Sequence, residues 1–159
     1  MVNNTTTILG IIKLTRHGVS PEKFYKIFEV NMNMTLYRLA AVINELLGFN
    51  FDHMFGFYTT TDPRNISKAD KIFELFADED LIDDPLGTYK TPPRKVRTNR
   101  VKSLFKDHKE ALFLFDYGDE WHFILTLLGT KTVKGKLPST YYRLIEKKGK
   151  NPIQYPPLD

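Results

Sequence analysis

One stretch of the chain, residues 36–47, carries an apolar stripe at helical spacing, whereas the other apolar runs are mostly short. The stripe consists of Leu36, Leu39, Ala40, Ile43, Leu46 and Leu47. A stripe of this width must be buried against another surface. Thr35 stands before it as an N-cap, and Gly48 follows it as a residue able to take the left-handed conformation. We therefore expect one main amphipathic helix packed on a sheet.

The other apolar runs predict strands joined by tight turns. Apolar and polar side chains alternate between residues 27 and 34, which is typical of a half-buried strand. Further strands are expected at residues 8–16, 53–60, 71–76, 110–115, 120–128 and 141–146, with a second, short helix near 99–108. Because hairpin connections dominate, the pattern predicts an α+β fold with a largely antiparallel sheet.

Length and composition indicate one domain across all 159 residues. The core should span about residues 8–146, and the tail, 147–159, should run extended over the surface. Apolar residues make up 42% of the chain and aromatic residues 13%, which argues against disorder. The chain has no cysteine, which excludes disulfides, thiolate chemistry and cysteine-ligated zinc or iron–sulfur clusters.

The sequence indicates a cytoplasmic protein with no membrane partner and no cofactor. Its longest apolar runs, Ala111–Phe115 and Phe123–Leu128, are far shorter than the roughly 20 residues that cross a bilayer. The first residues lack the basic region and long apolar segment of a secretory signal. Phosphate-binding loops, dinucleotide fingerprints and zinc-protease motifs are absent as well.

The densest polar cluster surrounds Trp121 and contains Asp116, Asp119, Glu120 and His122. Asp52 and His53 could join it in space, and carboxylates with imidazoles can bind a divalent metal or act as a general acid and base. The structural reading is that both aspartates bond the backbone of a tight turn, Gly118 supplies a positive φ, and Trp121 is buried core. We favour the turn and expect no metal. The catalytic candidates are Asp116, Asp119, His122 and His53.

Basic residues gather in two segments, although the formal net charge is only +4. Such clusters attract phosphate backbones. The predicted nucleic-acid-binding residues are Arg94, Lys95, Arg97, Arg100, Lys102, Lys147, Lys148 and Lys150, with Lys131, Lys134, Lys136 and Arg143 nearby in sequence. Tyrosines among them, Tyr89, Tyr141, Tyr142 and Tyr155, could stack on exposed bases. Alternatively, the charges only solvate the surface, or the acidic run 78–84 contacts the basic run 94–102 within the molecule.

Residues 115–122, Phe-Asp-Tyr-Gly-Asp-Glu-Trp-His, resemble the hallmark turn of the Ri-plasmid ORF-three-like proteins. The signature residues are Asp116, Gly118, Asp119 and Trp121. Gly18–Pro21, Thr35–Gly48, Phe51–Phe55 and Leu144–Gly149 are similar to other segments of that family. The chain differs in having Phe123 where many members have His, and in lacking their C-terminal Asp-Cys-Gly-Gly segment. The resemblance implies a compact α+β domain, often encoded on mobile elements, with no established activity.

Three functions follow as hypotheses. The leading one is a non-enzymatic binding or adaptor domain of a microbial or mobile-element protein, with nucleic acid as the partner. The second is a metal-dependent or acid–base enzyme, which requires His53 and His122 to meet in one pocket. The third is a protein–protein module, an inhibitor or scaffold that uses the acidic loop or exposed sheet edges.

Overall fold

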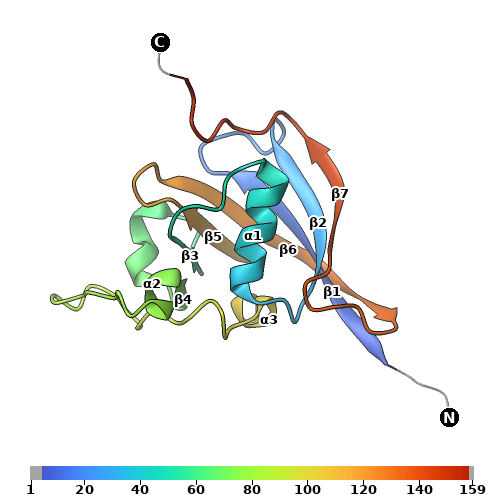
Figure 1. Cartoon of the computed structure of the whole chain (residues 1–159), viewed down its shortest axis with the longest axis horizontal. Coiled ribbons are helices and arrows are strands. Elements are labelled where there is room, and N and C mark those ends of the chain that lie inside the picture. The colour runs from blue at the N-terminus through green and yellow to red at the C-terminus, as the bar shows by residue number, and fades with distance from the viewer. Residues whose placement is uncertain (1–4, 158–159) are drawn as a thin grey trace.

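The computed structural model describes residues 5–157, and they form one seven-stranded sheet in the order β4-β3-β5-β6-β1-β2-β7 (Figure 1). Every neighbouring pair of strands is antiparallel. The strands are β1 (Thr6–Arg16), β2 (Tyr25–Asn31), β3 (Phe55–Tyr58), β4 (Ile72–Glu74), β5 (Glu110–Phe115), β6 (Trp121–Lys134) and β7 (Tyr142–Lys148). The expected α+β fold is confirmed, with the sheet as its dominant part.

The predicted main helix is α1 (Leu36–Leu47), and both of its ends are set by the residues that the sequence indicated. The Thr35 hydroxyl accepts the backbone N–H of Arg38 at 3.1 Å, and Gly48 takes a left-handed φ of 70°. The other helical elements are short: η1 (Pro63–Lys68), α2 (Leu75–Asp78) and α3 (Val101–Leu104). The helix expected near 99–108 is therefore a single turn.

The main core lies between α1 and one face of the sheet, called here the helix face. The helix contributes its whole predicted stripe, and alternate residues of the strands complete the core, among them Ile12, Leu14, Phe28, Phe57, Phe113, Phe115, Phe123 and Leu125. The opposite face carries a smaller cluster of Tyr58, Ala69, Ile72, Leu112 and Leu114. Residues on adjacent positions of one strand thus serve two separate apolar layers.

Several strand boundaries differ from the prediction. The strand expected at 53–60 begins at Phe55, so His53 lies in the preceding loop. The strand expected at 71–76 ends at Glu74, where the chain turns into α2. The strand expected at 120–128 continues to Lys134, because β6 pairs with β1 from Phe123 to Lys134 and the backbone bonds hold even where the side chains are polar.

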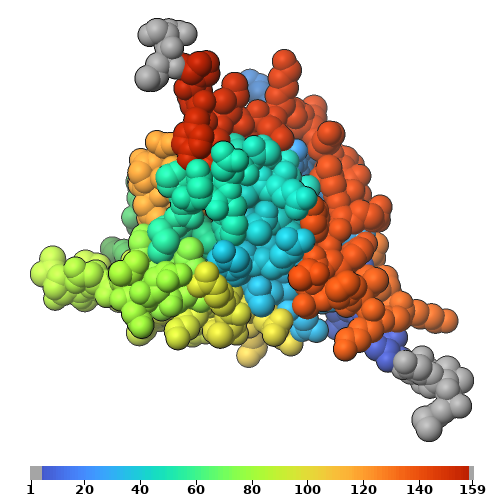
Figure 2. Space-filling model, in the orientation of Figure 1, coloured from blue at the N-terminus to red at the C-terminus, as the bar shows by residue number. Residues whose placement is uncertain are grey.

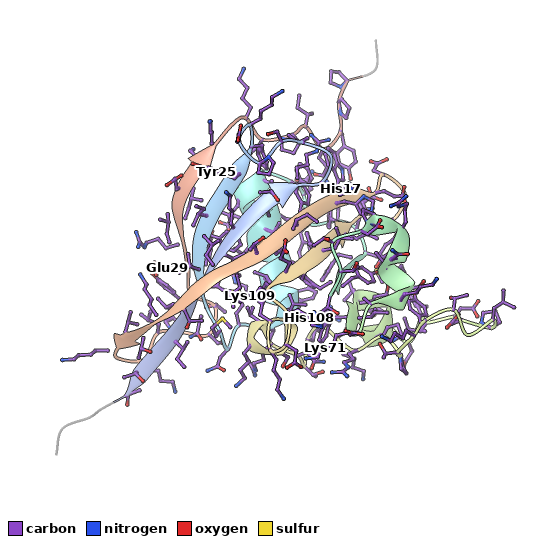
Figure 3. All side chains as sticks on the ribbon, turned by 180° about the vertical axis from the view of Figure 1, so that it is seen from behind. His17, Tyr25, Glu29, Lys71, His108 and Lys109 are labelled. Atoms are coloured by element: carbon purple, nitrogen blue, oxygen red, sulfur yellow. The ribbon has the colours of Figure 1, made fainter. Side chains whose placement is uncertain are left out.

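The polar positions of β2 were expected to face solvent, and this is wrong for Glu29, which is only 2% exposed. Glu29 is labelled in Figure 3. Its carboxylate accepts hydrogen bonds from Lys131 at 3.1 Å, Arg143 at 2.9 Å and Tyr141 at 2.8 Å. Burial alone would raise the pKa of Glu29, but these three donors outweigh it and hold the pKa below the usual range. The cluster ties the edge strand β7 to β2 and β6.

The C-terminal segment follows β7, which ends at Lys148. Gln154 holds it to the loop after α1: its Oε1 accepts the backbone N–H of Asn50 at 2.7 Å, and its Nε2 donates to the Asn50 carbonyl at 3.1 Å. Lys147 and Lys148, assigned to the tail from sequence, belong to β7. Among residues 5–157, no helix is both long and apolar enough to cross a membrane.

Candidate functional site

The turn at Asp116–Glu120 is held by its own aspartate. Asp116 Oδ1 accepts the backbone N–H groups of Gly118 at 3.0 Å and Asp119 at 3.3 Å. The left-handed positions are Asp116, with φ of 66°, and Glu120, with φ of 54°. The prediction that Gly118 supplies the positive φ is therefore wrong. Aspartate tolerates this conformation because its short side chain bonds the local backbone.

Trp121 closes the turn on the helix face. Its ring stacks on Phe123 and meets Phe49 edge-on, with ring centroids 5.0 Å apart in the second pair. The guanidinium of Arg16 lies 4.9 Å from the indole centroid. The side chain is half-buried rather than fully buried, and its Nε1 has no hydrogen-bond partner within residues 5–157. These contacts give Trp121 a packing role.

His53 does approach the signature turn, as the sequence suggested. Its Nε2 lies 3.4 Å from Asp116 Oδ2 and 2.6 Å from the Tyr155 hydroxyl, which donates to Asp52 Oδ2 at 2.9 Å. The ring of His53 packs edge-on against Phe115. The C-terminal segment therefore covers this cluster and uses its polar atoms for its own attachment.

His122 does not join the cluster. It pairs across the sheet with Leu114, on the face opposite α1, whereas His53 packs on Phe115 of the helix face. Its nearest ring is that of His17, 6.2 Å away, and burial lowers its pKa. Within residues 5–157, no group of three or more His, Asp or Glu side chains is placed to hold a metal ion. The hypothesis of an enzyme required His53 and His122 to meet in one pocket, and they lie on opposite faces of the sheet.

A buried carboxylate on the other face escaped the sequence reasoning. Glu74, only 1% exposed, accepts hydrogen bonds from the hydroxyls of Tyr58, Tyr89 and Tyr117. Burial raises the pKa of all three tyrosines, that of Tyr89 to about 12, so all three remain neutral at physiological pH. The only hint in the sequence is Tyr117, which stands inside the signature turn.

The predicted basic residues divide between two distant places. The segment from Arg94 to Lys102 lies along the side where α3 is found, and the lysines at 147–150 lie at the far end of β7 (Figure 1). Arg97 is occupied: it pairs with Glu79 at 3.1 Å and lies over the Tyr37 ring. Asp78 also accepts the backbone N–H groups of Val96 and Arg97. The contact between the acidic and basic runs is thus present within the molecule.

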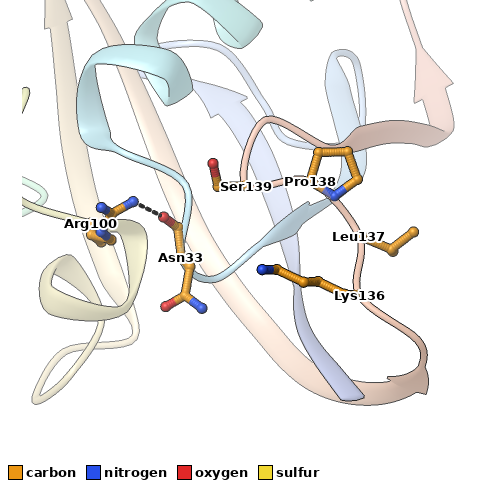
Figure 4. A pocket seen from close by; sticks show the side chains of 6 residues that line it. All are labelled: Asn33, Arg100, Lys136, Leu137, Pro138 and Ser139. Atoms are coloured by element: carbon orange, nitrogen blue, oxygen red, sulfur yellow. Dashed lines mark hydrogen bonds between the residues drawn. The ribbon is translucent and has the colours of Figure 1, made fainter. Parts of the chain in front are cut away.

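Two of the predicted nucleic-acid-binding residues, Arg100 and Lys102, line a groove together with Lys136. Figure 4 shows the part of this groove that contains Arg100 and Lys136. This basic groove is defined by Asn33, Arg100, Lys102, Lys136, Leu137 and Ser139. It comprises two adjoining hollows of about 710 Å³ and 750 Å³, and no acidic or aromatic residue lines either one. Lys136 comes from the β6–β7 connection, far from α3 in sequence, so only the fold could single it out from the other C-terminal lysines.

The walls of the basic groove are held by hydrogen bonds from two buried side chains, Asn31 and Thr7. Asn31 Nδ2 donates to the carbonyls of Leu137 at 3.2 Å and Pro138 at 3.0 Å, and its Oδ1 accepts the N–H of Asn33. Thr7 Oγ1 donates to the Gly135 carbonyl and accepts the Leu137 N–H. These bonds hold the β6–β7 connection against β1 and β2, and the burial of Asn31 and Thr7 protects them from water. Lys136 is thereby kept opposite α3.

Comparison with known proteins identifies a family and a fold. The family model described as plasmid pRiA4b ORF-3-like protein matches residues 11–154. A solved structure, a protein of unknown function from Methanosarcina mazei Go1, is similar with a TM-score of 0.66 and 20% identity, covering 91% of this chain and 72% of that one. No curated protein matches the sequence.

Proposed function

Because this chain belongs to the plasmid pRiA4b ORF-3-like family, which implies no established activity, we propose a function from its surface: a non-enzymatic domain that binds the phosphate backbone of nucleic acid in the basic groove. The observation that carries the proposal is a groove lined by Arg100, Lys102 and Lys136 with no carboxylate among its lining residues. When uncompensated cations of this kind neutralise phosphates, the counterions condensed on the nucleic acid are released, and this release favours binding.

The groove supports contact with phosphates rather than with bases. None of its lining residues is aromatic, so it offers no stacking platform. The tyrosines considered for stacking have other partners: Tyr89 donates to Glu74, Tyr141 to Glu29 and Tyr155 to Asp52, and Tyr142 lies under Arg38. Asn33 and Ser139 add neutral hydrogen-bonding groups beside the cations. We therefore expect binding that depends on salt and is indifferent to sequence.

The family's plasmid-derived description supports a microbial or mobile-element setting. We place the protein in the cytoplasm, where it would meet nucleic acid without crossing a membrane.

The test is fluorescence anisotropy of a labelled oligonucleotide, single- or double-stranded, measured across a salt series. Lys102→Gln with Lys136→Gln should weaken binding and reduce the slope of log K against log salt by about two, one for each phosphate that the variant no longer neutralises. The matched control is Lys147→Gln with Lys148→Gln, which removes the same charge from β7 and should leave most of the affinity. Arg100 is left intact because it also donates to the Asn33 carbonyl.

Two results contradict the proposal. One is the absence of binding at low salt with micromolar protein. The other is an equal loss of affinity in the groove variant and the β7 variant, because that would show diffuse attraction by net charge instead of a site.

A further inference from the structure

A narrow arm projects from the body of the molecule between α2 and α3 (Figures 1 and 2). We call residues 79–88 the acidic arm. It exposes three large apolar side chains to water: Leu86 is 86% exposed, Leu81 61% and Ile82 38%. Exposing apolar side chains to water is unfavourable in proportion to their exposed area, so such a group is typical of a contact surface.

The acidic arm is ordered by its own hydrogen bonds. Asp84 accepts the backbone N–H groups of Thr88 at 2.8 Å and Tyr89 at 3.1 Å, which hold the pKa of its carboxyl below the usual range. At the base, the Leu81 N–H donates to the Phe76 carbonyl at 2.8 Å, and Tyr89 is bonded to Glu74. An ordered arm loses less conformational entropy on docking than a flexible loop does.

The acidic arm carries charge that the molecule itself does not neutralise. Glu79 is paired with Arg97, and Asp84 is used in the turn. In the part of the chain that the structure describes, the Asp80 and Asp83 carboxylates have neither an ion pair nor a hydrogen bond. No Lys or Arg occurs between residues 79 and 89. The arm therefore presents apolar side chains flanked by two free negative charges.

The basic groove has the complementary composition. It combines Arg100, Lys102 and Lys136 with apolar lining from Leu137 and Ile8, and Ile8 is 52% exposed. The acidic arm cannot reach the groove of its own molecule, because the arm projects beyond α2 while the groove lies beside β1 and the β6–β7 connection (Figure 1). We infer that the acidic arm of one copy docks in the basic groove of a second copy.

This contact joins two different surfaces, so it is heterologous and propagates head to tail unless it closes into a ring. We expect a weak association, because the contact of one short arm with one groove should be smaller than a standard interface of about 1,600 Å². The arm and nucleic acid would also compete for the same cations. The inference does not require that nucleic acid bind, because the contact is between copies of the protein alone.

Sedimentation velocity of the protein without nucleic acid tests the inference. Over about 10–500 µM protein, the weight-average sedimentation coefficient should rise with concentration at low salt, and this rise should shrink at about 300 mM salt, where exposed charges are screened. Asp80→Asn with Asp83→Asn should remove most of it, as should Lys102→Glu with Lys136→Glu. Asparagine suits position 80, because Asp80 has a φ of 53°.

The decisive measurement mixes the two variants. The arm variant retains a wild-type groove and the groove variant a wild-type arm, so the mixture should form a 1:1 complex that does not grow further. Lys147→Glu with Lys148→Glu is the control of equal charge and should self-associate like the wild type. Circular dichroism confirms that each variant is folded.

The inference is overturned if the wild type stays monomeric at the highest concentration and low salt, or if the mixture of variants remains monomeric. Failure of the anisotropy experiment alone would leave it standing. If both proposals hold, the arm variant keeps its affinity for the oligonucleotide while the groove variant loses both activities.

Discussion

Replacing Gly56 by alanine tests whether the buried tyrosine cluster stabilises the sheet. A Cβ at this position would lie 2.7 Å from the Tyr58 hydroxyl oxygen, 2.8 Å from that of Tyr117 and 2.9 Å from Tyr58 Cζ. Such distances are well inside van der Waals contact, so both rings must move. Tyr58 is fully buried and bonded to Glu74, and the ring therefore cannot move without disturbing that hydrogen bond.

The cost has two parts. Forcing extra volume into a packed site costs about 1–3 kcal/mol. Weakening a hydrogen bond to a buried carboxylate costs about 1–3 kcal/mol more. The lower backbone entropy of alanine in the unfolded chain returns at most about 1 kcal/mol. Gly56→Ala should therefore lower the free energy of unfolding by about 3 kcal/mol.

The assay is urea denaturation followed by circular dichroism, with a thermal melt as a second measure. A loss of this size corresponds to a fall in Tm of about 6–12 °C for a domain near 150 residues. The matched control is Gly129→Ala on β6, where an added Cβ meets nothing within 4 Å. The control should unfold within about 0.5 kcal/mol of the wild type, as open surface positions do.

If Gly56→Ala is as stable as the wild type, the tyrosine hydroxyls do not lie over Gly56 and the packing argument fails. If both variants lose the same stability, the effect comes from a general property of glycine in strands and not from the Glu74 cluster.

Three further predictions concern other contacts. Trp121→Ala should cost about 3 kcal/mol in urea denaturation, the lower end for large aromatic residues, since the ring is half-buried; a negligible cost would mean that the indole is free for a ligand. Burial alone raises the pKa of Glu29, but its three donors lower that pKa overall. The stability that the Glu29 carboxylate gives to the fold is therefore complete above the unfolded-state pKa of about 4.3, and it is lost as the pH falls through the folded-state pKa. Glu29→Gln should thus flatten the fall in urea midpoint below that pH, and an unchanged acid limb would contradict the assignment. Gln154→Ala should speed amide exchange at Asn50, whose N–H donates to Gln154 Oε1, while exchange in α1 stays unchanged; equal protection of Asn50 in wild type and variant would show that Gln154 does not hold the tail.

Local patterns were sufficient for the parts of the fold governed by neighbouring residues. The stripe from Leu36 to Leu47, Thr35 and Gly48 predicted α1 to the residue, because helix hydrogen bonds and caps act within four positions. The alternation that begins at residue 27 indicated strand β2 for a similar reason. The short β4 and the single turn of α3 were less accurately predicted, since their ends depend on contacts with distant segments.

The candidate site shows the same division. The sequence left open whether His53 and His122 meet. The structure brings His53 to Asp116, whereas His122, one residue after Trp121 in β6, faces the other side of the sheet. The sequence did not indicate that Glu29 is buried, and its only hint of the Glu74 cluster is Tyr117. A carboxylate looks like a surface residue until the fold supplies its donors, which for Glu29 come from residues more than 100 positions away.

The sequence by itself determined the fold class, the main helix, the absence of cysteine chemistry and the signature turn, because each depends on composition or on residues close together in the chain. Tertiary structure decided which charges act together. It divided the basic residues between two places, joined Lys136 to Arg100 and Lys102, and paired Arg97 with Glu79 while Asp80 and Asp83 stayed free. Electrostatic interactions depend on distance in space and on burial, and neither quantity can be obtained from the order of residues alone.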